Sequence, residues 1–205
     1  MLSNKGFDLW ADGYDKSVGL SDESNTYPFA GYKAVLGRIY EIIMENGPCD
    51  VLDIGFGTGT LTAKLYDNGC RIWGQDFSAR MIDIAREKMP DAQLYAGDFS
   101  LGLAEALREQ KYDFIISTYA LHHLTMEAKV SFINELYGRL NEGGMVLIGD
   151  VAFENAAELK KCRAACGDEW DDDEIYFAYD EIRKHFPEMT FEKMSFCAGV
   201  LALKK

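Results

Sequence analysis

Between residues 50 and 153 the chain alternates short β-branched runs with segments of helical period. The runs typical of strands are residues 50–54, 70–76, 92–98, 112–119 and 143–153. The segments of helical period between them are residues 58–69, 78–89, 101–110 and 125–140. Strands that alternate with helices of this length form βαβ units, whose strands run parallel. We therefore expect an α/β fold with a doubly wound sheet.

The last quarter of the chain follows a different pattern. Residues 154–166 and 171–186 have the character of helices, and an acidic stretch separates them. Two strand-like runs then follow, residues 189–196 and 198–205, with almost nothing between them. Parallel strands need a crossover of about a dozen residues or more, so this pair is expected to form an antiparallel hairpin. The sequence thus predicts a seven-stranded mixed sheet with one reversed strand near an edge.

Residues 1–47 precede the first strand and form an expected helical cap. Two of its segments, 7–16 and 27–46, have helical character, and Pro28 suits the first turn of the second helix. We expect this cap to lie over the carboxyl-terminal edge of the sheet, where ligands bind in such folds. No repeat or linker interrupts the chain, so the cap and a core of residues 48–205 are predicted to form a single domain.

Charge and composition argue against several classes of function. The 34 acidic and 21 basic residues give a formal net charge of −13, which disfavours a nucleic-acid partner because a phosphate backbone would be repelled. The sequence has neither an apolar run of about eighteen residues nor a basic start followed by an apolar segment. We therefore expect neither secretion nor membrane insertion.

The cysteines point to a reducing compartment and not to a metal site. Five cysteines, an odd number, are scattered among core-like segments, which favours a cytoplasmic location. Cys162 and Cys166 have i,i+4 spacing, but no His or further Cys lies nearby in the sequence to complete a tetrahedral site. No metal is predicted.

The first strand leads into a glycine-rich turn, DVLDIGFGTG, which starts at Asp50. Its three glycines are spaced G-x-G-x-G from Gly55, and Thr60 stands where the dinucleotide fingerprint G-x-G-x-x-G has its last glycine. Gly57 lets the backbone approach a ligand without a Cβ in the way. Asp53 lies inside the strand, where a carboxylate needs a cationic or donating partner. A pyrophosphate is a poor partner for it, whereas a ligand with an ammonium and a sulfonium is a good one.

These motifs resemble those of the class I S-adenosylmethionine-dependent methyltransferases. VLDIGFGTG resembles their first motif, and WGQDFS, at residues 73–78, resembles the second, with Asp76 ending the second strand. AGDF at 96–99, YDFIISTYALHHLT at 112–125 and LNEGGMVLIGD at 140–150 are similar to the later motifs. The terminal hairpin is also typical of this family. The resemblance covers nearly the whole chain and is nearest to small, uncharacterised methyltransferases of Gram-positive bacteria.

The resemblance implies a Rossmann-like fold that binds S-adenosylmethionine, and it assigns residues to the adenosine. Asp76 would accept hydrogen bonds from both ribose hydroxyls. Phe77 and Met81 would pack on the adenine faces. Asp98 would accept from the exocyclic amine of the adenine, and the N–H of Phe99 would meet a ring nitrogen. Structural alternatives stay open: the two aspartates would start helices, and the apolar pair would be plain core.

The same resemblance assigns residues to the methionine part of the cofactor. Asp53 and the carbonyl of Gly55 would hold the methionine ammonium, and Gly57 would give the backbone its close approach. Trp10 and Tyr14 would lie over the methionine end and exclude water. Because Trp10 and Tyr14 have i,i+4 spacing, ordinary packing within a helix is the alternative for them.

Three residues after the fourth strand are candidates for catalysis. His122 and His123 stand at the edge where an acceptor would lie, and a histidine there could take the proton of a hydroxyl or amine nucleophile. Tyr119 is a comparable candidate. The alternative is that one histidine caps the next helix or bonds to a backbone carbonyl.

The acceptor favoured by the sequence is a small molecule. The region after the fourth strand lacks the Asn/Asp-Pro-Pro-aromatic motif that orients the planar amino groups of bases and amides. Two other functions stay open, a catalytically silent S-adenosylmethionine-binding regulator and a nicotinamide-dependent oxidoreductase. Thr60, the terminal hairpin and the lack of a Tyr-x-x-x-Lys pair disfavour the oxidoreductase. The sequence also leaves open a homodimer, the acceptor and the atom that would be methylated.

Overall fold

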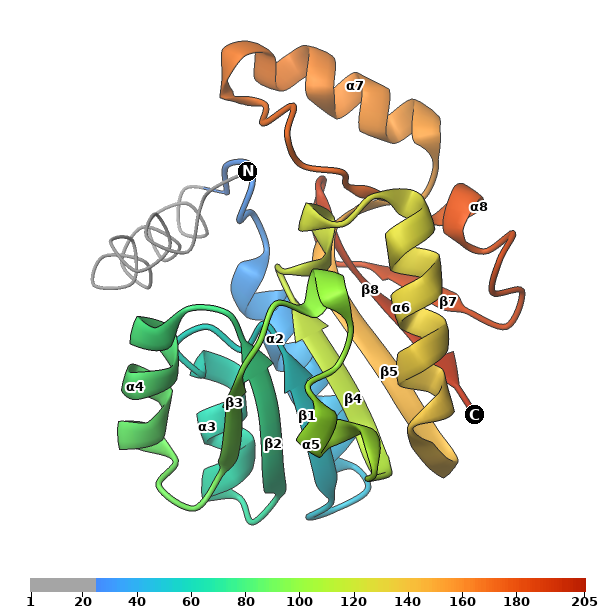
Figure 1. The fold of residues 1–205 in the computed structure, drawn as a ribbon. Helices are drawn as coiled ribbons and strands as arrows, with labels where there is room; N and C mark the ends of the chain where they lie inside the picture. The colour runs from blue at the N-terminus through green and yellow to red at the C-terminus, as the bar shows by residue number, and fades with distance from the viewer. Residues whose placement is uncertain (1–24) are drawn as a thin grey trace.

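The computed structural model of the protein describes residues 25–205. A central sheet separates two layers of helices (Figure 1). The strands are β1 (Asp50–Ile54), β2 (Arg71–Asp76), β3 (Gln93–Ala96), β4 (Tyr112–Thr118), β5 (Leu140–Phe153), β6 (Phe177–Ala178), β7 (Thr190–Lys193) and β8 (Ala198–Lys204). The α-helices are α2 (Tyr32–Met44), α3 (Thr60–Asp67), α4 (Ala79–Lys88), α5 (Glu105–Arg108), α6 (Met126–Gly138), α7 (Ala156–Cys166) and α8 (Tyr179–Ile182). The 3-10 helices are η1 (Phe99–Leu101), η2 (Leu121–His123) and η3 (Gly167–Glu169).

The sheet has the mixed topology that the sequence predicts. Its strand order is β3-β2-β1-β4-β5-β8-β7. The strands β3, β2, β1, β4 and β5 pair in parallel, and β8 pairs antiparallel with both β5 and β7. The expected hairpin and the single reversed strand near an edge are therefore confirmed. The two-residue strand β6, which was not predicted, pairs with β5 outside this order.

Apolar side chains cover both faces of the sheet, which explains the nearly continuous apolar runs of the parallel strands. In β1, Val51 packs in the core beneath α2, α3 and α4, whereas its neighbour Leu52 packs in the core beneath α5, α6 and α8. Figure 1 shows α6 along one face of β4 and β5 and α2 behind the sheet. None of the helices within residues 25–205 is long and apolar enough to cross a membrane.

Three expectations about helices are wrong. The helix expected over residues 101–110 is reduced to the single turn of α5. The helix expected over residues 27–46 begins only at Tyr32, because Gly31 has a left-handed φ of 81° that helical backbone cannot include. Pro28 therefore lies before the helix and not in its first turn. The helix expected over residues 171–186 is reduced to the single turn of α8.

Tertiary hydrogen bonds explain why residues 171–178 are not helical. The N–H of Ile175 donates to the carbonyl of His122 at 2.8 Å, and the carbonyl of Ile175 accepts from the Nζ of Lys129. Lys129 is fully buried, so these bonds draw the segment against η2 and α6. A backbone that is bonded outward cannot form the i→i−4 bonds of a helix. We call residues 171–178 the strap.

The helical cap is described only in part, because residues 7–16 lie outside the described residues. Its helix α2 packs on the sheet face formed by β5 and β8. At Gly149 of β5, a Cβ would stand 2.4 Å from Cγ1 of Val35 and 2.9 Å from Cδ1 of Ile39. A glycine is therefore required there for α2 to lie this close to the sheet.

Gly149→Ala is expected to lower the free energy of unfolding by about 1–3 kcal/mol, because the added methyl overpacks the contact with α2. Gly37→Ala is the matched control. Gly37 is exposed inside α2, and apart from its chain neighbours and the backbone of its own helix no described atom lies within 4 Å of its Cβ position. This control is expected to raise the free energy of unfolding by about 0.5–1 kcal/mol, from helix propensity alone. Urea denaturation measures both changes, and an unaltered Gly149→Ala protein would contradict the close packing.

Candidate functional site

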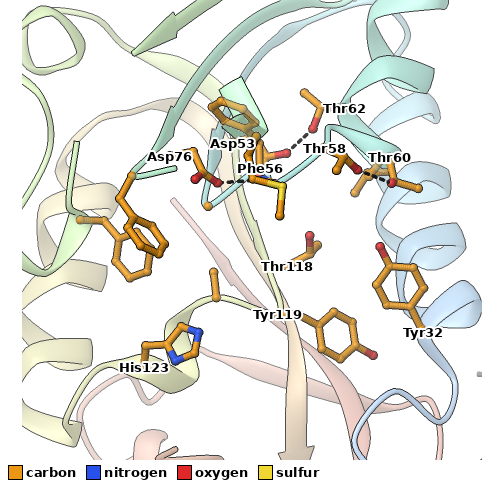
Figure 2. Close-up of a pocket in the computed structure, with 17 residues that line it drawn as sticks. Tyr32, Asp53, Phe56, Thr58, Thr60, Thr62, Asp76, Thr118, Tyr119 and His123 are labelled. Atoms are coloured by element: carbon orange, nitrogen blue, oxygen red, sulfur yellow. Dashed lines mark hydrogen bonds between the residues drawn. The ribbon is translucent and has the colours of Figure 1, made fainter. Parts of the chain in front are cut away.

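A cavity opens at the carboxyl ends of β1, β2 and β4. Seventeen described residues line it (Figure 2). They come from the ends of these three strands, from the turns that follow them, and from α2, α3, α4, η1 and η2. From β1 the chain continues to β2 on one side of β1, and it later reaches β4 on the other side of β1. The carboxyl ends of these strands are therefore the topological switch point of the sheet. Ligands of open α/β sheets bind at such a point.

The glycine-rich turn forms one wall of the cavity. Gly55 and Gly57 have φ values of 69° and 56°, a left-handed conformation that side chains disfavour. A Cβ on Gly55 would stand 2.6 Å from Cβ of Ala120, so the turn packs tightly against the segment after β4. By contrast, apart from Gly57 itself and its two chain neighbours, no described residue has an atom within 4 Å of the Cβ position of Gly57. Gly57 therefore presents bare backbone next to the cavity.

Asp53 is a buried carboxylate in this wall, with a side chain that is only half satisfied. Its Oδ2 accepts a hydrogen bond from the hydroxyl of Thr62 in α3, whereas its Oδ1 has no hydrogen-bond partner among the described residues. Burial raises the pKa of Asp53 to about 7; the bond from Thr62 opposes this rise, and the charge of Asp76 adds to it. A buried acceptor without a donor is costly, so this oxygen calls for a donor or a cation in the cavity.

Asp76 ends β2 and is held by two backbone donors. The N–H of Gly57 donates to its Oδ2 at 2.9 Å, and the N–H of Ser78 donates to its Oδ1 at 2.9 Å. Ser78 in turn caps α4 by accepting from the N–H of Met81. The carboxylate therefore joins the glycine turn to the start of α4. A carboxylate has about four acceptor sites, so it can accept from several donors at once.

Most of the residues predicted from the sequence meet at this cavity. Those that line it are Asp53, Gly55, Gly57, Asp76, Phe77, Met81, Phe99, Tyr119 and His123. Asp98 and His122 do not line it. The Oδ1 of Asp98 accepts from the N–H of Ser100 at 2.8 Å and caps η1, which is the structural alternative considered for it. Trp10 and Tyr14 lie outside the described residues.

Several hydroxyl-bearing residues of the cavity were missed. Tyr32 reaches it from the start of α2, and Thr118 from the end of β4. Thr58 and Thr60 also line it, and their hydroxyls lie 3.2 Å apart. These two threonines belong to the glycine-rich motif, so the motif alone was enough to predict that they line the cavity. Tyr32 had no such signal, because its position depends on where α2 begins.

The two histidines of η2 have different surroundings. His122 is buried, and its Nδ1 lies 2.6 Å from Oδ1 of Asp150. Burial disfavours the charged form of His122, but the carboxylates of Asp150 and Glu174 outweigh it and raise its pKa. His123 faces the cavity, and burial together with the charge of His122 lowers its pKa to about 4. His122 therefore has the kind of role considered as the alternative to catalysis, a hydrogen bond that holds the ring, but its partner is the carboxylate of Asp150 and not a backbone carbonyl.

Tyr119 lies among aromatic rings at the edge of the cavity. Its ring centroid is 5.4 Å from that of Phe29 and 5.1 Å from that of Tyr32. The backbone of Tyr119 has a positive φ of 49°, which is uncommon for a residue other than glycine. Its N–H donates to the carbonyl of Gly149 at 2.8 Å, so the turn after β4 is fixed to β5.

Solved structures with this fold include methyltransferases. One is described as a DhpI–SAH complex, with a TM-score of 0.71 and 16% identity over 97% of this chain and 93% of that one. Another is magnesium protoporphyrin IX methyltransferase from Synechocystis PCC 6803 with bound SAH. It has a TM-score of 0.68 and 17% identity over 86% of this chain and 84% of that one. At these identities the likeness concerns the fold.

Sequence comparisons identify the family. The profile of the family described as "Methyltransferase domain" matches residues 51–144. An uncharacterized methyltransferase of Anoxybacillus flavithermus is 38% identical over 73% of this chain and 67% of its own length. An uncharacterized methyltransferase of Bacillus pumilus is 33% identical over 97% of this chain and 95% of its own length. Because this second match spans nearly all of both chains, the protein belongs to this family of methyltransferases.

Proposed function

We propose that this methyltransferase binds S-adenosylmethionine in the cavity and transfers its methyl group to a small-molecule acceptor. The observation that carries the proposal is that the Oδ1 of Asp53, a buried carboxylate oxygen, has no hydrogen-bond donor among the described residues. Beside it, the backbone of Gly57 is not covered by a side chain of its own. The methionine part of S-adenosylmethionine brings an ammonium that satisfies this oxygen. The wall therefore fits an amino-acid end and fits a pyrophosphate poorly, because an ionised pyrophosphate has no proton to donate to this oxygen.

At the methionine end, Asp53 would accept from the ammonium through Oδ1 while Thr62 holds Oδ2. The carbonyl of Gly55 would accept a second ammonium hydrogen. The bare backbone of Gly57 would allow the cofactor to approach closely. The lid role of Trp10 and Tyr14 stays a prediction of the sequence.

At the adenosine end, Asp76 would accept from the ribose hydroxyls in addition to its two backbone donors. Phe77 and Met81 would pack on the adenine, and the N–H of Phe99 would donate to one of its ring nitrogens. All four residues line the cavity, which supports these roles. An adenine contact by Asp98 stays a prediction that would use its Oδ2, because Oδ1 caps η1.

When bound, S-adenosylmethionine supplies a methyl group on a positively charged sulfur. The residues of this chain then have to align the acceptor with that methyl group and to exclude water, and alignment alone can supply roughly 7–11 kcal/mol of the barrier. His123, Tyr119 and Tyr32 lie across the cavity from Asp53 and Asp76 and would form the acceptor side (Figure 2). The acidic balance of the chain supports a small molecule over nucleic acid. A cytoplasmic location stays a prediction.

Calorimetry with S-adenosylhomocysteine and with NADH tests the choice of cofactor. We expect S-adenosylhomocysteine to bind and NADH to give no heat, because a pyrophosphate has no donor for the buried oxygen of Asp53. Binding of NADH without binding of S-adenosylhomocysteine would overturn the proposal. A screen of small metabolites with S-adenosylmethionine carrying a tritiated methyl group then tests turnover. Cofactor binding without transfer to any acceptor would favour the silent regulator instead.

Asp76→Ala is expected to weaken S-adenosylhomocysteine by about 2–4 kcal/mol, from the loss of two hydrogen bonds to a charged group. Titration calorimetry measures the change. Asp83→Ala removes an exposed carboxylate from α4 and is the matched control, with no expected effect on affinity. Thermal melts of both variants check folding, because Asp76 also accepts from Gly57 and Ser78. An unchanged dissociation constant in a folded Asp76→Ala protein would mean that the ribose lies elsewhere.

Asp53 gives the proposal a pH signature. Because its pKa is raised to about 7 in the fold, the ligand-free protein holds a proton there between about pH 4 and pH 7, where the unfolded chain does not. The folded state thus binds more protons in this window, so this group makes the stability of the ligand-free protein fall as pH rises through it. The affinity for a cationic ligand is expected to rise with pH through the same window, since the ligand needs the ionised carboxylate.

S-adenosylhomocysteine is therefore expected to bind about tenfold more weakly at about pH 5.5 than at about pH 7.5. Asp53→Asn removes the charge with little change of shape and is expected to bind weakly at both pH values, with this dependence lost. Calorimetry at the two pH values measures the difference. Equal affinities of the unaltered protein at both would refute the pairing of Asp53 with the ammonium.

A further inference from the structure

Three side chains with metal-binding atoms converge beside the cavity, and one of them, His123, also lines it. His122 and His123 of η2 and Glu174 of the strap each bring one ligand atom within 4.8 Å of the other two. The three come from two segments that are far apart in the sequence. All of them are at least partly buried, so the cluster is not a set of solvated surface charges. We propose that they form a site for one divalent transition-metal ion, placed so that the ion meets the acceptor.

The spacing between His122 and Glu174 suits a shared ion better than a direct hydrogen bond. The Nε2 of His122 lies 3.5 Å from Oε1 of Glu174. A charge-assisted hydrogen bond between such atoms is shorter, about 2.7–2.9 Å. Two ligands of a tetrahedral ion with bonds of about 2.1 Å stand roughly 3.4 Å apart. The observed gap therefore matches the second arrangement.

Asp150 orients His122 as an outer carboxylate orients a ligand histidine. Its Oδ1 lies 2.6 Å from Nδ1 of His122, so the other ring nitrogen, Nε2, is turned toward Glu174. Asp150 is fully buried in β5, and its Oδ1 also accepts from the N–H of Val151. A carboxylate, a histidine and a metal in this sequence are the usual arrangement in metalloproteins, because the carboxylate fixes the tautomer and raises the basicity of the ring.

The two residues that follow Glu174 in the strap hold it in place. Next to it, Ile175 donates to the carbonyl of His122 and accepts from the buried Nζ of Lys129. The hydroxyl of Tyr176 donates to Oε2 of Glu174, so Oε1 remains directed at His122. A ligand set needs supporting bonds of this kind to keep its geometry. The departure of residues 171–178 from a helix thereby places Glu174 opposite the histidines.

The donor set and the position of the site indicate its role. Two imidazoles and one carboxylate suit ions such as Zn²⁺, Co²⁺ or Mn²⁺, and three protein ligands leave a fourth position open. His123 lines the cavity, so the open position would face the acceptor. An ion there would bind a hydroxyl-bearing acceptor and lower its pKa, and the hydroxyl proton would pass to solvent. This role rests on the proposed function, whereas metal binding itself does not.

The test uses the full-length chain stripped with a chelator and titrated with Co²⁺ and with Zn²⁺. We expect one ion per chain, with visible absorption bands for Co²⁺ in a tetrahedral site. Glu174→Gln and His123→Gln are each expected to lose at least about tenfold in affinity. The matched controls are Glu169→Gln and His185→Gln, which alter an exposed glutamate of η3 and the remaining histidine of the sequence. The controls are expected to bind the metal as the unaltered protein does.

Binding of S-adenosylhomocysteine is measured on the same samples, with and without metal. Its retention in Glu174→Gln and His123→Gln shows that these variants fold, and it reports on the proposed function separately from the metal site. Failure of the unaltered protein to bind either ion would overturn the proposal, and so would equal metal affinity in the Glu174→Gln variant and the controls. If the unaltered protein binds metal but does not bind S-adenosylhomocysteine, the proposed function alone is overturned.

Discussion

The hydrogen bond between the N–H of Gly57 and the carboxylate of Asp76 is the interaction on which the cavity depends. It ties the turn after β1 to the end of β2, and the second oxygen of Asp76 ties both to the start of α4 through Ser78. The turn has left-handed backbone at its glycines, which are free to adopt other conformations as well, so the bond helps to hold it in this one. With the turn fixed, Asp53 and Gly57 both face the same space.

The two carboxylates of this wall have different environments, and the difference separates their tasks. Asp76 accepts two backbone N–H bonds, which favour its charged form. Asp53 is buried, has one hydroxyl partner and lies near the charge of Asp76, so its proton is retained up to about pH 7. The ionised form of Asp53 is therefore the one that a bound cation would stabilise. A ligand with hydroxyls at one end and an ammonium at the other complements both.

The sheet and most of the cavity could be predicted from the sequence because they depend on local signals. The β-branched runs define β1, β2 and β4, and the ends of these strands necessarily bring Asp53, Asp76 and Tyr119 to one edge. The strap could not be predicted, since its conformation depends on bonds to His122 and Lys129, which lie some fifty residues earlier in the chain. Its residues have helical period, and tertiary bonding overrides that preference. For the same reason, the pairing of Asp150 with His122 and the approach of Glu174 had no sequence signal.

The place of β8 between β5 and β7 has a consequence for how the protein is made. β7 comes off the ribosome before β8, yet it joins the sheet only through β8. A nascent chain that ends in β7 therefore carries β5 with an unpaired backbone edge and apolar residues on both sides of it. Such an edge is a template for pairing with other chains during translation. The hairpin that completes the sheet is thus also what removes this aggregation hazard, and the interval before it forms is when a chaperone would be of most use.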